Sequence, residues 1–96
     1  MKLGLLLGGE NTALKDVVTL GVAAEAAGFD SIWCPEFWRS AFVPLAALAG
    51  ATARVRLAPA VSMAFPLSPF LHARFALDLD ELSDGRFIFA LGTGTL

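Results

Sequence analysis

The clearest candidate for chemistry in this sequence is the carboxylate of Glu36. It lies between Trp33 and Trp38. A carboxylate beside aromatic rings can act as an acid or a base if it is desolvated, so Glu36 is the candidate catalytic residue. An ion pair with Arg39 or Arg54 is the structural alternative.

We expect structural rather than catalytic roles for two other reactive side chains, Cys34 and His72. Cys34 has no His or Lys near it in the sequence that would lower its pKa, so we interpret it as a core residue. His72 lies inside a predicted helix, away from the expected site, where we expect a solvated or capped histidine rather than a catalytic one. One Cys and one His cannot build the usual metal sites, so no metal site is expected.

Four segments that follow predicted strands are rich in aromatic residues and poor in catalytic polar groups. They are Gly8 to Glu10, Cys34 to Trp38, Ala60 to Phe65 and Gly92 to Thr95. In parallel α/β folds ligands collect at the carboxyl ends of the strands, so we expect these segments to share one rim. Such a rim suits a flat ring system better than a phosphorylated sugar.

Two glycine patterns resemble nucleotide-binding loops without matching them. Gly4-x-x-x-Gly8-Gly9 lacks the G-x-G-x-x-G spacing, so a Rossmann site is not expected, and NAD(P) titration would test that alternative. The segment Gly92 to Gly94 contains no Lys and precedes no visible helix, which excludes a P-loop. These glycines either form a turn that needs positive φ or let a ring approach the backbone.

The elements that must position these residues alternate in type. The predicted strands are Lys2 to Leu7, Phe29 to Cys34, Val55 to Val61 and Arg86 to Leu91. The predicted helices run from Thr12 to Ala27, from near Pro44 to Ala53, and from Ser68-Pro69 to Ser83-Asp84-Gly85. Strict alternation predicts parallel strands joined by right-handed crossovers, and the continuous apolar runs predict strands covered on both faces.

Capping residues mark the predicted helix ends. Asn11 or Thr12 is available to cap the first helix, and Gly28 ends it in a left-handed conformation. Ser68 precedes a proline and caps the third helix. The apolar face expected on this helix consists of Leu71, Phe75, Leu79 and Leu82.

Composition narrows the class of protein. The chain has 96 residues, of which 56% are apolar and 17% charged, and its mean hydropathy is +0.68. These values exclude disorder and favour a parallel α/β sheet with one core. A net charge of −2 without a basic stripe argues against nucleic acid as a partner.

A membrane location and secretion are not expected. The longest uncharged runs are shorter than the roughly 20 residues that span a bilayer, and the opening apolar run lacks a signal-peptide cleavage site. The lone Cys34 fits a reducing compartment, so we expect a cytoplasmic protein.

Two sheet closures fit this pattern: a doubly wound sheet and a (β/α)₈ barrel. A barrel needs eight strands and about 250 residues. The chain would therefore hold the N-terminal half of a barrel, with four parallel strands and three helices. We expect residues 1–96 to form a partial barrel domain, truncated at its C-terminus.

Four segments also match a known family in order and spacing. They are Ala23 to Trp33, Thr52 to Leu57, Leu77 to Phe87 and Leu91 to Gly94. Together they span essentially the whole chain, which resembles the N-terminal part of the luciferase-like monooxygenase superfamily. The resemblance implies a (β/α)₈ barrel that uses FMN or the deazaflavin coenzyme F-420 for hydride or oxygen chemistry on a small-molecule substrate, usually as a homo-oligomer.

The resemblance also implies site residues. Family members place a non-prolyl cis peptide behind the flavin ring at the end of the third strand, and Ala60-Val61 is the best match. We therefore predict a cis or strongly distorted peptide within Pro59 to Ser62. The implied cofactor-binding residues are Ala60, Val61, Ser62, Gly92, Thr93 and Gly94.

The segment Trp33 to Phe37 looks like the deazaflavin branch, so coenzyme F-420 is the first choice of cofactor and FMN the second. Several deazaflavin enzymes carry an Asp-His pair where this sequence has Glu36-Phe37. Proton transfer by that histidine is excluded, which leaves Glu36 as the local candidate. Later strands of the family, absent from this chain, supply the phosphate-tail site. The alternative function is a non-catalytic half-barrel that acts only by association through its open edges.

Overall fold

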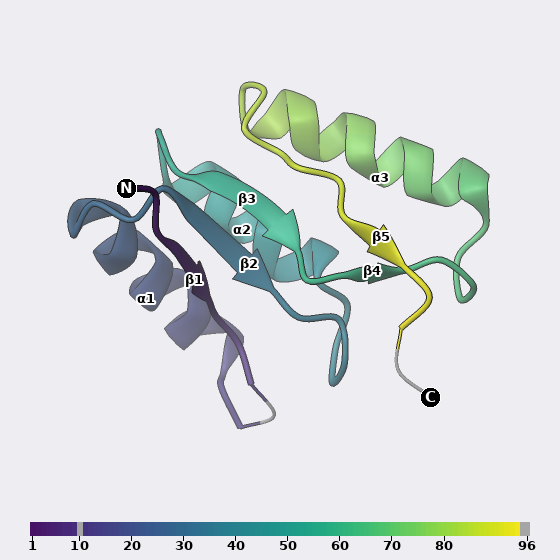
Figure 1. The fold of residues 1–96 in the computed structure, drawn as a ribbon, viewed down its shortest axis with the longest axis horizontal. Helices are drawn as coiled ribbons and strands as arrows, with labels where there is room; N and C mark the ends of the chain where they lie inside the picture. The colour runs from purple at the N-terminus through teal and green to yellow at the C-terminus, as the bar shows by residue number, and fades with distance from the viewer. Residues whose placement is uncertain (10, 95–96) are drawn as a thin grey trace.

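The computed structural model describes residues 1–9 and 11–94, shown as a ribbon in Figure 1. Its elements in chain order are β1 (Gly4–Leu6), α1 (Leu14–Ala26), β2 (Ser31–Cys34), α2 (Phe42–Ala51), β3 (Arg56–Pro59), β4 (Ser62–Met63), α3 (Pro69–Leu82) and β5 (Leu91–Gly92). Three helices alternate with parallel strands, so the predicted α/β class is confirmed.

The strands form two parallel sheets. One sheet has the order β1-β2-β3, with Leu5 opposite Ile32 and Ile32 opposite Leu57, and the other pairs β4 with β5. Helices α1 and α2 connect the neighbours of the first sheet, because parallel strands need a crossover. Both helices lie behind that sheet in the view of Figure 1.

The third predicted strand differs from the structure. It is two strands, β3 and β4, separated by Ala60 and Val61. Hydrophobic periodicity could not show this break, because the apolar run continues through both residues.

The fourth predicted strand, over residues 86–91, is regular only at β5. Upstream of β5 it touches β3 through one bridge, between Leu57 and Phe87. Two backbone bonds hold this bridge: Leu57 N–H donates to the Arg86 carbonyl at 3.0 Å, and Ile88 N–H donates to the Leu57 carbonyl at 2.8 Å. Instead of one four-stranded sheet, the described residues form sheets of three and two strands.

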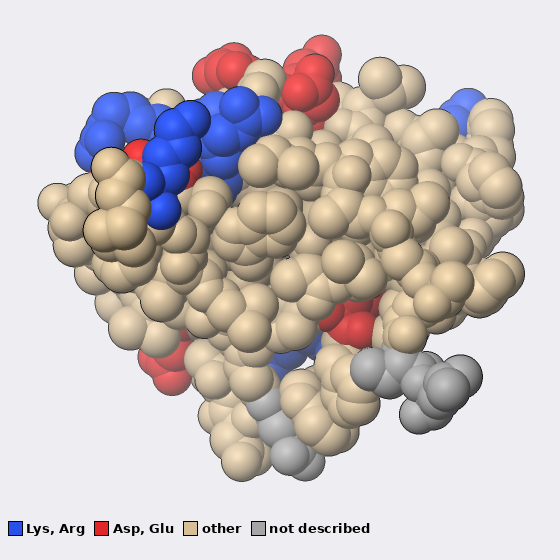
Figure 2. All heavy atoms as spheres, in the orientation of Figure 1, with Lys and Arg blue, Asp and Glu red and all other residues tan. Residues whose placement is uncertain are grey.

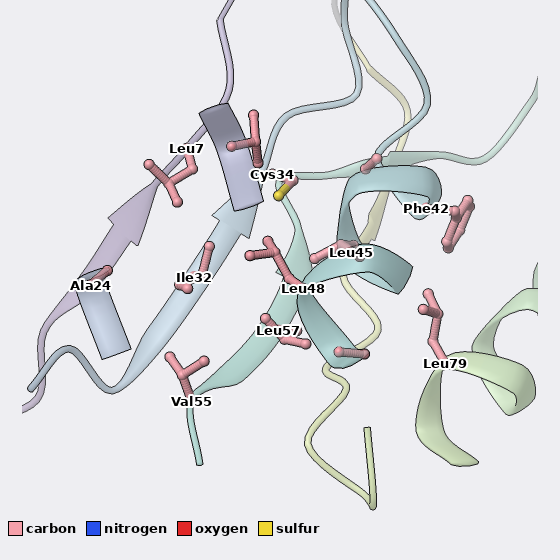
Figure 3. Packing of buried hydrophobic residues seen from close by; sticks show 13 residues of the cluster. Leu7, Ala24, Ile32, Cys34, Phe42, Leu45, Leu48, Val55, Leu57 and Leu79 are labelled. Carbon is pink, nitrogen blue, oxygen red and sulfur yellow. The ribbon is translucent and has the colours of Figure 1, made fainter. Parts of the chain in front are cut away.

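The core lies between the first sheet and helices α1 and α2 (Figure 3). Its largest fully buried side chains are Val17, Ile32, Leu45, Leu48, Val55 and Leu57. The opposite face of the sheet is open at β1, where Leu6 is 62% exposed. Strands covered on both faces were expected, and this is wrong for β1 because the helices pack on one face only.

The helix ends follow local sequence chemistry in two of three cases. Gly28 follows α1 at φ +95°, and the Ser68 side chain accepts the Leu71 N–H at the start of α3, as predicted. The predicted Asn11 or Thr12 cap of α1 is wrong. Ala13 is the N-cap, and its methyl group cannot accept a hydrogen bond, while the Thr12 hydroxyl accepts the Gly9 N–H.

The predicted apolar face of α3 is only partly buried. Leu79 is 5% exposed and packs in the core, whereas Leu71 is 41% and Leu82 is 52% exposed. Among the residues that the structure describes, no helix combines the length and apolarity needed to cross a membrane.

Two charged side chains that the sequence analysis did not single out tie the helices to the sheet. The Glu25 carboxylate accepts backbone N–H bonds from residues 53–55, immediately before β3, at 2.6 to 3.1 Å. The Arg86 guanidinium donates to the carbonyls of Ala49, Thr52 and Val55. The last turn of α2 thereby obtains the partners that helix C-termini lack.

Candidate cofactor site

A cavity of about 540 Å³ opens at the carboxyl ends of the strands. It is lined by Pro35, Glu36, Phe37, Ala60, Val61, Met63, Thr93 and Gly94. Three of the four expected rim segments therefore meet, and the volume lies in the range typical of small-molecule sites.

The remaining rim segment lies outside this cavity. Gly8 and Gly9 border a separate small pocket with Cys34 and Trp38. Of the expected rim residues, Glu10 and Thr95 lie outside the described part of the chain. Figure 2 shows that Lys and Arg gather near the N-terminus, whereas the visible face over β4 and β5 carries few charges.

The peptide bond between Ala60 and Val61 is cis, as predicted. Both residues line the cavity, and the Val61 side chain is 39% exposed. Backbone bonds fix the chain on either side: Ala60 N–H donates to the Cys34 carbonyl and Ser62 N–H to the Ala90 carbonyl, both at 2.8 Å. The cavity wall at this point is formed by firmly bonded backbone.

Gly92 and Gly94, which follow the fourth predicted strand, leave space for neighbouring side chains, and Gly94 also lies in a turn. A Cβ at Gly92 would lie 2.7 Å from Val61 Cγ2, and a Cβ at Gly94 would lie 2.7 Å from Met63 Sδ. Gly94 also has φ +86°, which agrees with a turn. The missing side chains make room for Val61 and Met63, so both glycines shape the cavity wall through their neighbours.

Glu36 lines the cavity with both carboxylate oxygens engaged. Oε1 accepts the Met63 N–H at 2.9 Å and lies 3.5 Å from Ser62 Oγ, and Oε2 accepts the Ala41 N–H at 3.2 Å. The carboxylate thereby fastens β4 to the start of α2.

The ion-pair alternative for Glu36 is wrong among the described residues. Arg39 Nη2 donates to the Thr12 carbonyl at 2.8 Å, and Arg54 Nη2 donates to the Glu25 carbonyl at 3.2 Å. Both guanidinium groups are used elsewhere, so neutral backbone donors, rather than an arginine, hold Glu36.

His72 lies next to the site and is buried, so its expected place away from the site and the solvated alternative are both wrong. The residue is 4% exposed, and its Nε2 lies 3.1 Å from the Oγ of Ser62, which is fully buried. Its Nδ1 lies 3.2 Å from the Ser68 carbonyl oxygen. The sequence held one hint: His72 occupies the first turn of α3, which begins shortly after β4.

The neighbouring side chains divide into core and rim. Cys34 is 1% exposed, and burial raises the pKa of its thiol to about 12, so its interpretation as core is confirmed. The rings of Phe37 and Trp38 pack edge to face near the cavity, with their centroids 4.6 Å apart. Trp33 lies elsewhere: its Nε1 donates to Ser31 Oγ, and it borders a pocket lined by residues from the amino ends of the strands. Within the described ranges, no three His, Cys, Asp or Glu side chains are grouped to hold a metal ion.

The sequence matches one family and several relatives. The family model described as luciferase-like monooxygenase covers residues 1–95. A Mycobacterium tuberculosis protein, described provisionally as a coenzyme F-420-dependent oxidoreductase, is 44% identical over 96% of this chain and 27% of its own length. The 5,10-methylenetetrahydromethanopterin reductase of Archaeoglobus fulgidus is 33% identical over 74% of this chain and 22% of its own length.

Solved structures show the same arrangement of elements. The coenzyme F-420-dependent tetrahydromethanopterin reductase of Methanopyrus kandleri superposes with a TM-score of 0.90 at 25% identity, over 98% of this chain and 27% of that one. The oxygenating constituent of 3,6-diketocamphane monooxygenase from Pseudomonas putida, in complex with FMN, gives 0.91 at 21% identity over 100% of this chain and 30% of that one, and this likeness concerns the fold alone. The chain thus spans between 22% and 30% of the length of these proteins.

Proposed function

The chain belongs to the luciferase-like monooxygenase family, and from that premise we propose that it forms the first half of a (β/α)₈ barrel and one wall of a flavin or deazaflavin site. The observation that carries the proposal is the cavity of about 540 Å³, where three strand ends converge. Barrel enzymes place their active sites at this end of the strands.

The residues present fit a flat ring. Ala60 and Val61 offer an uncharged surface, and Thr93 and the backbone of Gly94, which follow the neighbouring strand β5, offer hydrogen-bonding groups in the same cavity lining. Ser62 supports this wall from below, because it is fully buried. A bound ring would supply hydride or oxygen chemistry on a small organic substrate, while the protein contributes orientation and electrostatics.

Glu36 is the proposed proton-handling group of this site. A carboxylate has about four lone-pair positions. Met63 and Ala41 donate to two of them, and Ser62 lies near a third. At least one position thus stays available to a donor in the cavity.

Coenzyme F-420 is the cofactor we propose first and FMN second. Two proteins with at least 25% identity to this chain carry F-420 in their names or descriptions, from Mycobacterium tuberculosis and Methanopyrus kandleri. A small-molecule substrate, a homo-oligomeric state and a cytoplasmic location belong to the same proposal. The alternative, a half-barrel that acts only by association, is supported by the open face of β1.

Cofactor titration of the intact protein tests this proposal. We expect F-420 to bind more tightly than FMN, with Val61→Asp raising the Kd at least about 10-fold because a bound ring would bury the introduced charge. Val43→Asp is the matched control, since Val43 lies 59% exposed on α2. Stoichiometric FMN without F-420 would overturn the cofactor choice, and binding of neither would overturn the function.

A further inference from the structure

We propose that His72 is a positioning residue: its Nε2 accepts a hydrogen bond from the Ser62 hydroxyl and so keeps that donor away from Glu36. This inference rests on the proposed function, because it assigns a role in the same cavity wall. Its basis is a continuous set of contacts, from Glu36 Oε1 to Ser62 Oγ at 3.5 Å and from Ser62 Oγ to His72 Nε2 at 3.1 Å.

The partner of the other ring nitrogen determines the direction of these bonds. His72 Nδ1 lies 3.2 Å from the Ser68 carbonyl oxygen, which can only accept. Nδ1 must therefore carry a hydrogen, and in the neutral ring Nε2 is then an acceptor. The Ser62 hydroxyl is the donor within reach of it.

The Ser62 hydroxyl has a single hydrogen and two candidate acceptors. His72 Nε2 at 3.1 Å is closer than Glu36 Oε1 at 3.5 Å, and hydrogen bonds weaken steeply at the longer distance. While the hydroxyl donates to His72, Oε1 of Glu36 keeps only the Met63 N–H bond. A lone pair of the carboxylate is thereby left for a donor in the cavity.

The surroundings of the imidazole favour a fixed orientation. The rings of Phe42 and Phe89 lie 6.3 and 5.9 Å from it, and His72 itself is 4% exposed. Glu36, reached through Ser62, is the charged side chain linked to it by these contacts. A histidine needed only to fill this aromatic pocket could be replaced by phenylalanine without consequence for Glu36.

A double-mutant cycle in the intact protein tests the proposal through the Met63 amide, which reports on Glu36 Oε1. His72→Phe keeps the aromatic packing but removes the acceptor, so Ser62 should turn to Glu36 and compete with Met63 for Oε1. We expect the Met63 amide proton to move upfield in the NMR spectrum of His72→Phe. The same replacement should have no such effect in a Ser62→Ala background, and His72→Gln should restore the wild-type position.

The controls separate this role from packing. Ser83→Ala removes another buried hydroxyl, and the amides of Ala53 and Val55 bind a different carboxylate, that of Glu25. Ser83→Ala should not move the Met63 amide, and His72→Phe should not move the amides of Ala53 and Val55. An unshifted Met63 amide in His72→Phe, or a shift that persists without Ser62, would overturn the proposal.

Two further measurements complete the test. With cofactor and substrate, His72→Phe should lower kcat by about 3- to 10-fold, the value of one hydrogen bond, with KM changed less than about twofold. If no cofactor binds the wild type, the proposed function fails while the amide cycle still decides the role of His72. If His72→Phe does not fold, the ¹⁵N spectrum of wild-type His72 decides: hydrogen on Nδ1 supports the proposal, and hydrogen on Nε2 alone overturns it.

Discussion

Cys34 and Ser62 are both buried side chains near the carboxyl ends of the strands, but burial affects them differently. Cys34 lies in the hydrophobic core, and desolvation raises the pKa of its thiol to about 12. Ser62 is also fully buried, yet its hydroxyl reaches His72 and Glu36. Of the two, only Ser62 is in a position to influence the cavity.

Native Cys34 should therefore resist alkylation. With a pKa of about 12, roughly one thiol in 10⁴ is ionised at pH 8, and the side chain is 1% exposed. We expect iodoacetamide to label the native protein at least about 100-fold more slowly than the urea-unfolded protein. Equal rates at pH 8 would contradict the burial of this thiol.

The same shift predicts how stability depends on pH. The unfolded thiol ionises near its ordinary pKa of 9.0, whereas burial raises the pKa of the folded thiol to about 12. The folded state binds more protons between these values, so its stability falls as pH rises, by up to about 1.4 kcal/mol per pH unit. Urea unfolding at pH 7.5, 9 and 10 should show this loss in the wild type and a smaller one in Cys34→Ala.

The sequence predicted the role of a residue where that residue contacts backbone close to it in the chain, and failed where the contact is with a distant element. Gly28 and Ser68 act on neighbouring backbone, so their types predicted their roles. The Ala60-Val61 peptide was predicted from a family resemblance. The contact between His72 and Ser62 depends on how α3 folds against β4, and no short pattern encodes that.

The helices and the first two strands were predictable to within about two residues at each end, whereas the third and fourth strands were not. Helix ends are marked by residues such as Gly28 and Ser68, but β3 and β4 lie within one apolar run. The links between elements were also missed, because Glu25 and Arg86 act on backbone groups about 30 residues away.

Glu25 joins α1 to β3 and should stabilise the fold in a pH-dependent way. Burial alone would raise the pKa of Glu25, but the amides of Arg54, Val55 and Ala53 and the Arg54 guanidinium outweigh it and lower that pKa. Glu25→Gln should reduce the free energy of unfolding at pH 7 by about 1 to 3 kcal/mol, because charged hydrogen bonds are lost.

The difference between wild type and Glu25→Gln should vary with pH in one direction. A lowered folded pKa means that the stabilisation is present above the unfolded value near 4.5 and is lost as pH falls through the folded value. Urea unfolding at pH 7, 5 and 3 would measure how the free energies of unfolding of the wild type and Glu25→Gln approach each other as pH falls. Glu81→Gln, at an exposed position of α3, serves as the control, and a difference that grows towards pH 3 would contradict this interpretation.

The molecule as a whole carries apolar surface that its own helices do not cover. Leu6 on β1 is 62% exposed, Leu91 on β5 is 53% exposed and Phe65 after β4 is 81% exposed. The chain spans 27% of the length of the first relatives it matches, in which further segments follow or surround the matched part. Apolar strand faces and unpaired strand edges favour association with other chains.

The 96-residue chain studied by itself should therefore self-associate through its sheet. We expect size-exclusion chromatography with light scattering to give a mass above that of the 10.1 kDa monomer at micromolar concentration. Leu6→Lys should shift the distribution towards monomer, because a charge on the open face of β1 opposes sheet contact. Leu77→Lys is the matched control, since Leu77 is 70% exposed but lies on α3.

If only the control reduces the mass, association runs through the helices and the sheet argument is wrong. A two-state monomer would contradict both the half-barrel assignment and the association alternative, since each leaves the strands in need of partners.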